Sequence, residues 1–215
     1  MMRTDDLRRE GKFKIADWVD KAQKAWEEHA TQKNLKRWPE AIDYVNYNGK
    51  LVNQRLDHRY SVTYTASGTH IAAALIDTHK LPDFRIGSTR ISPRGFVPDV
   101  TTFCYSTNNI HEARYLTAIL NSNTLDERIK QDQPKGKFGP RHIHRRPFQF
   151  PIPRFDSNNK LHNRIVTLEE KAEEQASKSK KVSRLRLKSV IPEMEEIDKL
   201  VVELLDGSDQ PLDKS

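Results

Sequence analysis

RYSVTYTASGTHIAAALID, residues 59–77, carries the pattern from which the fold class is inferred. Short alternating runs lie on both sides of Ser67-Gly68, and a Gly-containing dipeptide between such runs is typical of a β-hairpin. We therefore expect two antiparallel strands here. The alternation in FRIGSTRIS (84–92) and GFVPDVTTFCYST (95–107) predicts further short strands.

A second turn signal precedes this stretch. In AIDYVNYNGKLVNQ (residues 41–54), Asn48-Gly49 separates two short β-like runs, which predicts another hairpin. Proline cannot donate a hydrogen bond within a central strand, and three prolines interrupt the runs that follow. They are Pro82, Pro93 and Pro98. The middle of the chain therefore predicts a mixed, largely antiparallel sheet of short strands.

Helical periodicity precedes this region. Between about residues 5 and 37, apolar residues recur at i, i+3, i+4 and i+7 from Ile15. This spacing predicts a helix with one apolar stripe. Trp18 and Trp26 could stack on a ligand, but aromatic residues at helical spacing are usually core residues. We therefore expect both tryptophans to belong to the core.

Three more helices are predicted after the sheet, near residues 110–120, 158–178 and 191–205. A polar side chain before an apolar repeat can accept the unpaired N–H groups of the first turn, and proline is favoured within that turn. The expected residues at these helix starts are Asn108 or Asn109, Asp156 or Ser157, and Pro192.

These patterns together predict an α+β protein with packing helices and a C-terminal helical region. We expect three regions along the chain. Residues 1–40 form an N-terminal helical segment, residues 41–156 form an α+β domain, and residues 157–215 form a helical region and tail.

Composition narrows the class of protein and partner. The 215 residues include 37 Lys and Arg against 30 Asp and Glu, a net charge of +7, which favours polyanionic partners. The single cysteine, Cys104, fits a reducing compartment. No apolar run approaches the ~20 residues that a membrane span needs, and no signal peptide is recognised. We therefore expect a soluble, cytoplasmic protein without membrane contact.

Residues 135–154 contain no Asp or Glu at all. KGKFG (135–139) offers backbone amides beside cations, and RHIHRR (141–146) would alternate donors along an extended strand. Such donors bind phosphates, and Arg also pairs with guanine in the major groove. The alternative is a solvated loop whose charges cost little. The Lys and Arg residues of this segment are Lys135, Lys137, Arg141, Arg145, Arg146 and Arg154.

Several catalytic motifs do not occur in the sequence. There is no G-x-G-x-x-G, no phosphate loop, no H-E-x-x-H and no Pro-Pro pair, and one cysteine cannot build a usual structural zinc site. His142 and His144 could share a face, but no carboxylate or cysteine nearby completes a metal site. Asp99 with Glu112 could begin a metal-dependent nuclease motif, although Arg114 stands where lysine is expected.

The order of motifs resembles the TaqI-like C-terminal specificity domain of type II restriction–modification methyltransferases, also called the target recognition domain. The similarity extends over about residues 13–206. The matching pieces are DYVNYNGKLVNQ, YSVTYTASGTHIAAALID, FVPDVTTFCYST, HEARYLTAILNS, KGKFGPRHIHRRPFQFPIPRFD, NNKLHNRIVTLEEKA and EIDKLVVELLDG.

This resemblance implies that the chain reads double-stranded DNA for a prokaryotic adenine-specific DNA methyltransferase of type II or IIG, with or without a fused endonuclease. In that family a separate N-terminal domain binds S-adenosylmethionine and methylates the base. The chain lacks such a domain, so we expect no cofactor and no enzymatic activity of its own. Its partners would be DNA and a methyltransferase or endonuclease domain, in cis or in trans.

We expect the DNA contacts to come from the basic segment and a neighbouring loop. The predicted DNA-binding residues are Arg90, Arg94, Lys135, Lys137, Arg141, His142, His144, Arg145 and Arg146. Two other functions remain open at this point. One is a protein-interaction module that dimerises through its terminal helices, and the other is a stand-alone nuclease that uses Asp99.

Overall fold

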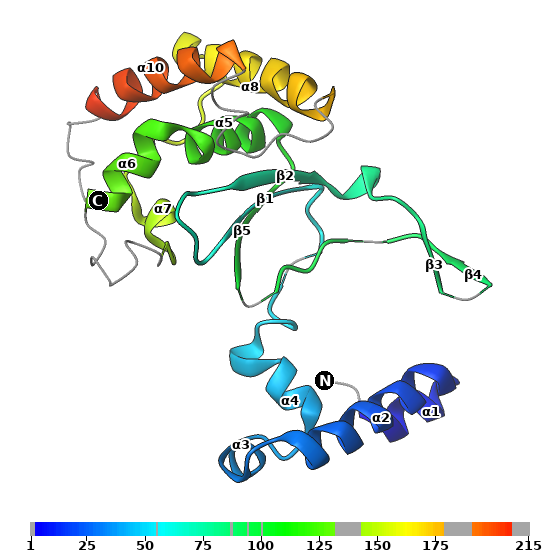
Figure 1. Cartoon of the computed structure of the whole chain (residues 1–215). Helices are drawn as coiled ribbons and strands as arrows, with labels where there is room; N and C mark the ends of the chain where they lie inside the picture. Colours follow the sequence, from blue (N-terminus) through cyan, green and yellow to red (C-terminus); the bar gives the residue numbers. More distant parts are fainter. Residues whose placement is uncertain are drawn as a thin grey trace. The chain divides into compact units, whose positions relative to one another are not determined.

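The structure is a computed structural model that describes residues 3–54, 56–86, 88–93, 95–99, 101–131, 143–178 and 191–207 (Figure 1). Packing divides the chain into two units, residues 1–55 and residues 56–215. The three regions expected from the sequence were defined by role. The two units are defined only by contacts within the chain, so they do not test those three boundaries, which stay a prediction.

The described part of the first unit is helical. Its elements are α1 (Thr4–Arg9), α2 (Phe13–His29), α3 (Gln32–Arg37), α4 (Ala41–Val45) and a 3-10 turn, η1 (Tyr47–Gly49). The helical periodicity before residue 37 is thus divided among three helices. Gly11 has a φ of 72° and separates α1 from α2, because the left-handed conformation cannot continue a helix. Thr31 begins α3 by accepting a hydrogen bond from the N–H of Asn34.

Residues 41–54 do not form the hairpin predicted at Asn48-Gly49. The Oδ1 atom of Asn46 accepts hydrogen bonds from the N–H groups of Leu51 and Val52, at 3.0 and 3.2 Å. These local bonds satisfy donors that a strand would have used. Tyr44 of α4 also stacks on Trp26 of α2 at 4.3 Å between ring centres, so tertiary packing favours a helix here.

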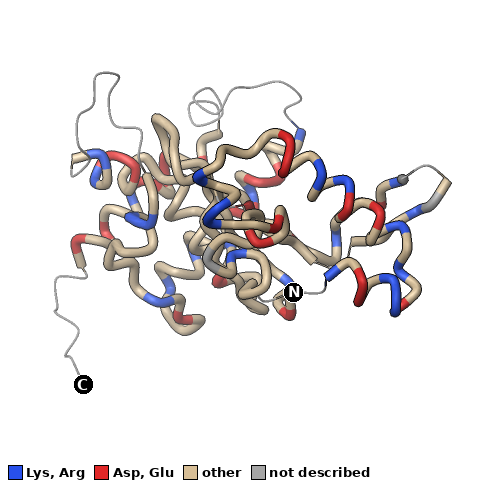
Figure 2. Tube along the Cα trace, turned by 90° about the horizontal axis from the view of Figure 1, so that it is seen from below, with Lys and Arg blue, Asp and Glu red and all other residues tan. Residues whose placement is uncertain are grey.

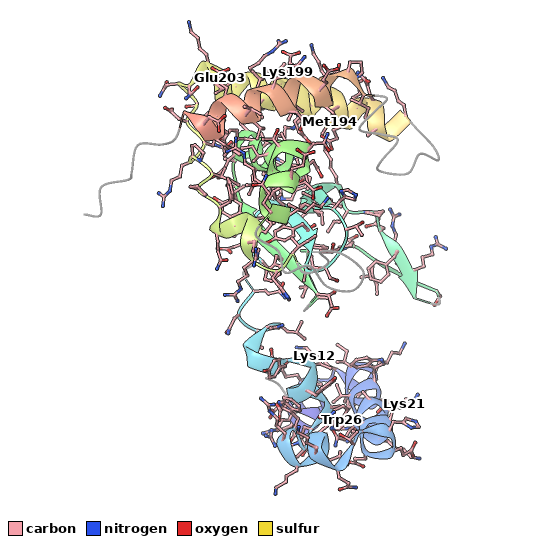
Figure 3. All side chains as sticks on the ribbon, turned by 60° about the vertical axis from the view of Figure 1, so that its left-hand side comes forward. Lys12, Lys21, Trp26, Met194, Lys199 and Glu203 are labelled. Atoms are coloured by element: carbon pink, nitrogen blue, oxygen red, sulfur yellow. The ribbon has the colours of Figure 1, made fainter. Side chains whose placement is uncertain are left out.

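The expectation that both tryptophans of α2 are core residues is not borne out, since neither is fully buried. Trp26 is half-buried and donates from its indole nitrogen to the carbonyl of Trp38 (Figure 3). Trp18 is 67% exposed and Ile15 is 53% exposed, so the prediction that Trp18 is a core residue is wrong. The more buried stripe instead contains Ala16 and Trp26, because α1 and α4 pack on that side.

The second unit contains the sheet. Strands β1 (Tyr60–Thr65), β2 (Ala73–Asp77) and β5 (Thr102–Thr107) lie in the order β2-β1-β5, with both pairs antiparallel. The hairpin predicted across Ser67-Gly68 is confirmed, although its connection is longer than that dipeptide. Strands β3 (Phe84–Ile86) and β4 (Thr89–Ile91) form a separate antiparallel pair. The α+β class with short, antiparallel strands is therefore correct.

Helices cover one face of the sheet in two layers (Figure 1). The first layer is α5 (Ile110–Asn121) with α6 (Asn123–Gln131), and the second is α8 (Lys160–Lys178) with α10 (Pro192–Asp206). The short helix α7 (Arg146–Gln149) contacts α6. One core runs through these layers, with fully buried members from β1, α5, α6, α8 and α10. They include Val62, Ile119, Leu125, Ile165 and Ile197.

The ends of these helices explain where the chain turns. The Asn109 side chain accepts from the N–H groups of His111 and Glu112, which confirms the predicted cap of α5. Pro192 occupies the first turn of α10, also as predicted. The cap of α8 is Asn159, which accepts from the two N–H groups that follow Lys160, and not Asp156 or Ser157. Within the described residues, no helix combines the length and apolarity needed to cross a membrane.

Candidate nucleic-acid interface

Residues 143–154 are the described part of the basic segment, and they start with a turn that is held in place by neighbouring residues. Ile143 is 2% exposed, and its N–H group and that of His144 both donate to the carbonyl of Ala66, at 3.0 and 2.8 Å. The hydroxyl of Tyr64 donates to the carbonyl of His144 at 2.8 Å. The turn is therefore attached by a buried side chain, by two hydrogen bonds to the loop after β1 and by one from β1 itself.

Beyond this turn the chain is not extended, contrary to the alternating strand expected at residues 141–146. His144 has a φ of 48°, in the left-handed region, and α7 begins at Arg146. Pro147 in the first turn favours that helix start. The side chains of His144 and Arg145 are exposed and that of Arg146 is half-buried. Three predicted DNA-binding residues thus lie together at one corner of the second unit.

Aromatic side chains lie beneath these cations. The ring of Phe103 on β5 stacks with Tyr64 at 5.5 Å, and the ring of Phe148 on α7 meets Tyr64 edge-on at 5.0 Å. The guanidinium carbon of Arg145 is 6.0 Å from the centre of the Phe103 ring, within the range of a cation–π contact. Burial raises the pKa of Tyr64, while the nearby Arg145 opposes this shift. Tyr64 is therefore neutral at ordinary pH.

A groove of about 650 Å³ continues from this corner along the segment that links α7 to α8. Tyr105, Phe148 and Arg154 are among its lining residues. The hydroxyl of Tyr105 donates to Glu112 at 2.8 Å, and burial together with this bond raises the pKa of Tyr105 to about 12. The exposed Arg154 is close enough to oppose that shift. The groove therefore combines ring faces with a cation and with the carboxylate of Glu112.

Arg90 belongs to a different part of the second unit. In the β3–β4 pair it lies directly opposite Arg85, and both side chains are exposed. Arg90 also pairs with the carboxylate of Asp83. In Figure 1 this hairpin and α7 lie at opposite ends of the sheet. That they share one DNA-facing surface stays a prediction.

The remaining predicted DNA-binding residues lie outside the described part of the chain. They are Arg94, Lys135, Lys137, Arg141 and His142.

The carboxylates considered for a nuclease site have other partners. Glu112 accepts from the hydroxyls of Tyr105 and Thr107, at 2.8 and 2.5 Å. Asp99 accepts from the hydroxyl of Thr101 at 3.3 Å. Among the described residues, no group of three or more His, Cys, Asp or Glu side chains could hold a metal ion.

The distribution of charge sets this corner apart from the described helices. Along most of the described helices, acidic and basic residues occur together (Figure 2). Residues 143–155 contain three arginines and no carboxylate. Sequence reasoning counted Arg154 in the basic segment but did not select it, and it missed Tyr105 and Phe148. The Pro-flanked PIPRFD motif was a signal for Arg154, whereas the aromatic cluster depends on contacts between distant segments.

Comparison of the chain with models of known protein families, with curated proteins and with solved structures found no match.

Proposed function

We propose that the chain is a DNA-binding module that recognises a duplex site for a separate catalytic domain. The observation that carries this proposal is the acid-free segment at residues 143–155, where the exposed Arg145 lies over the Phe103 ring of an aromatic cluster. Arginine contacts phosphates and the edge of guanine, and an absence of carboxylates removes repulsion from the DNA backbone.

The resemblance to the target recognition domain supports a more specific role within this proposal. The chain would read the site for an adenine-specific methyltransferase of a restriction–modification system, in the cytoplasm. S-adenosylmethionine would bind the partner domain, since this sequence has neither a glycine-rich loop nor a Pro-Pro tetrad. The chain by itself would then bind DNA without methylating it.

The test measures binding of the full chain to a fluorescent duplex with a randomised centre, by anisotropy over a range of salt concentrations. Arg145 and Arg146 are changed together to Ala. If both meet phosphates, the slope of log K against log salt falls by about 0.9 for each lost contact. If one reads guanine, discrimination at one base pair falls by roughly 1–3 kcal/mol.

A matched control removes the same charge elsewhere. Lys160 and Lys171 are exposed on α8, and changing both to Ala also lowers the net charge by two. The control is expected to retain most of the affinity and the original slope. Equal losses in the two double variants would show that net charge alone attracts DNA. Unchanged binding in the Arg145/Arg146 variant, with its circular dichroism spectrum intact, would reject this corner as the interface.

A further inference from the structure

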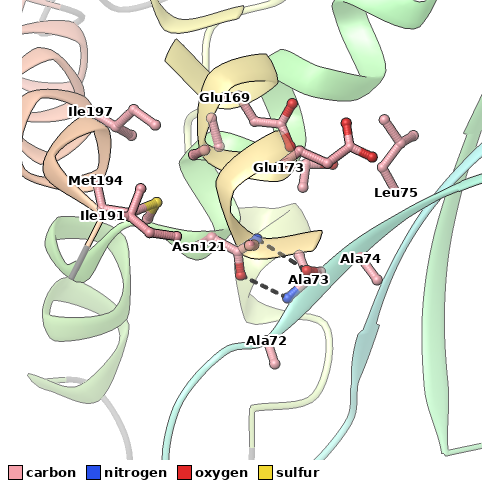
Figure 4. Close-up of a pocket in the computed structure, with 14 residues that line it drawn as sticks. Ala72, Ala73, Ala74, Leu75, Asn121, Glu169, Glu173, Ile191, Met194 and Ile197 are labelled. Carbon is pink, nitrogen blue, oxygen red and sulfur yellow. Dashed lines mark hydrogen bonds between the residues drawn. The ribbon is translucent and has the colours of Figure 1, made fainter. Parts of the chain in front are cut away.

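A second groove, unrelated to the arginine corner, lies between the edge strand β2 and the helices above it (Figure 4). Its volume is about 360 Å³, and most of its lining is apolar. The floor is the β2 end of the sheet, and the walls come from α5, α8 and the start of α10. Small side chains leave the space open. The alanines that line it are Ala72, Ala73, Ala74, Ala118, Ala172 and Ala176.

The backbone of β2 has a hydrogen-bonding edge at this groove. Asn121 of α5 accepts from the N–H of Ala73 and donates to its carbonyl, both at 3.0 Å. The backbone groups of Ala73 therefore point away from β1. Backbone direction repeats every second residue in an antiparallel strand, so the N–H and carbonyl of Leu75 also point outward. β2 is an edge strand of its three-stranded sheet, and Leu75 is where an added strand could pair.

Carboxylates from α8 give the groove a negative end. Glu169 is 7% exposed, and its Oε2 atom lies 4.0 Å from Nε of Arg114 without a hydrogen-bond partner among the described residues. The half-exposed Glu173 lines the same groove, and its carboxylate extends toward Leu75 (Figure 4). Arg114 pairs with Glu170 and lies 3.4 Å from Glu173. One arginine thus faces three glutamates, so negative charge is in excess here once Glu169 is ionised.

We propose that this groove is a docking site for an extended segment of a partner protein, with an apolar residue followed two positions later by lysine or arginine. The segment would pair with the outward N–H and carbonyl of Leu75, as in strand addition to a sheet edge. Residues two apart share one face of a strand. The apolar side chain would therefore enter the space above the alanines, while the cation reaches Glu169 and Glu173.

The titration of Glu169 supplies an independent readout of docking, through the dependence of affinity on pH. Burial, followed by repulsion from Glu173, raises the pKa of Glu169 to about 8, although Arg114 opposes the shift. The other groups that face it are Glu170 on α8 and the apolar residues of β2 and α10. A bound cation stabilises the carboxylate, so docking releases a proton from Glu169. Affinity therefore rises as pH increases towards 8.

The test uses the full chain and a fluorescent synthetic peptide, Thr-Val-Thr-Lys-Thr-Val-Thr, with binding followed by anisotropy. Saturable binding is expected, and replacing the peptide lysine with glutamate should abolish it. Changing Glu169 and Glu173 together to Gln should weaken binding about tenfold, or about 1.4 kcal/mol, and remove its dependence on pH. Equal binding of the lysine and glutamate peptides, or no saturable binding, would overturn the proposal.

A pair of variants in α8 tests the location. Ala176 lines the groove, so Ala176→Phe should fill it and block the peptide, while Ser177→Phe, one residue on and exposed, should not. Equal effects of the two changes would place the peptide elsewhere.

Residues 179–190 lie outside the described part of the chain, and their sequence contains Arg184, Arg186 and Lys188. If changing these three residues to Ser strengthens peptide binding tenfold, the chain's own segment is the occupant and the partner proposal fails.

Discussion

Asn121 is a single side chain that completes the backbone bonding of an edge strand. Its amide donates to and accepts from the backbone of Ala73, both at 3.0 Å, in the manner of a neighbouring strand. It also ends α5, where Ser122 donates from its hydroxyl to the carbonyl of Ile119 at 2.7 Å. The polar residues after the apolar face of α5 therefore connect the helix to the sheet as well as terminate it.

Replacing Asn121 with Ala should destabilise the second unit by about 1–3 kcal/mol, because the N–H and carbonyl of Ala73 lose their partners in a partly buried place. Urea unfolding measures this loss. Asn163→Ala is the control, since its amide makes one exposed bond, to the carbonyl of Ser157. Similar losses of unfolding free energy in both variants would show that the contact of Asn121 with β2 stabilises the protein no more than an exposed hydrogen bond does.

Glu169 predicts how stability depends on pH. Its pKa in the folded protein is raised to about 8 from an ordinary 4.5, so the folded state holds a proton that the unfolded state has already released. The free energy of unfolding should therefore fall as pH rises from 4.5 to 8, at up to about 1.4 kcal/mol per pH unit from this group. Glu169→Gln should remove that part of the slope.

Chemical unfolding at several pH values within this window measures the effect. Glu170→Gln is the control, because this neighbour on α8 is 64% exposed. Parallel stability curves for Glu169→Gln and the unmodified chain would show that the buried carboxyl does not titrate as inferred.

At the scale of elements, the β1–β2 connection is held by one buried carboxylate. Asp126 of α6 is 5% exposed at its side chain and accepts from the N–H of Ile71 at 2.8 Å. It also pairs with His70 at 2.8 Å and with Lys130 at 2.7 Å. Burial raises the pKa of Asp126, but the bonds from Lys130, Ile71 and His70 together lower it below the ordinary value. Asp126 therefore joins the hairpin to α6 as an ion.

Asp126→Asn should destabilise the protein by about 1–3 kcal/mol near neutral pH, since the buried hydrogen bonds lose their charge. The contribution of an acid with a lowered pKa is complete above its unfolded value and is lost as pH falls through the folded one. The difference between variant and unmodified chain should thus shrink below pH 3.8. Glu174→Gln is the control, because Glu174 forms an i,i+4 pair with Lys178 in which both side chains are exposed. A constant difference down to acid pH would contradict the ionic role of Asp126.

The elements differ in how far the sequence could predict them. The β1–β2 hairpin and the Asn109 cap followed from local signals that tertiary packing did not oppose. Asn48-Gly49 carried an equally good turn signal, but the Asn46 side chain and the stacking of Tyr44 on Trp26 favoured helix. In the candidate site, Arg145 and Arg146 were predicted from charge. The rings beneath them come from segments about 40 residues apart in sequence, and no local pattern reveals such contacts.

At the scale of the molecule, one core joins segments from both ends of the second unit. Val62 of β1 and Ile119 of α5 belong to the same buried cluster as Ile165 of α8 and Ile197 of α10. Helix α8 packs on α5, and α10 packs on α8. The sheet and α5 therefore bury their apolar surface only when the C-terminal helices are in place. This arrangement bears on whether residues 41–156 can fold without residues 157–215.

A chain that ends at residue 156 should lose the cooperative fold of its second unit, because it lacks the buried face of α8 and α10. The expected product keeps helical circular dichroism, loses near-ultraviolet signal and binds a hydrophobic dye. Ile197→Ala in the full chain is the matched control. It removes part of one fully buried side chain, which should cost about 2–5 kcal/mol while the protein still unfolds in a cooperative transition. Cooperative unfolding of the shortened chain would instead show that residues 41–156 are a domain in their own right, with the C-terminal helices as an appendage.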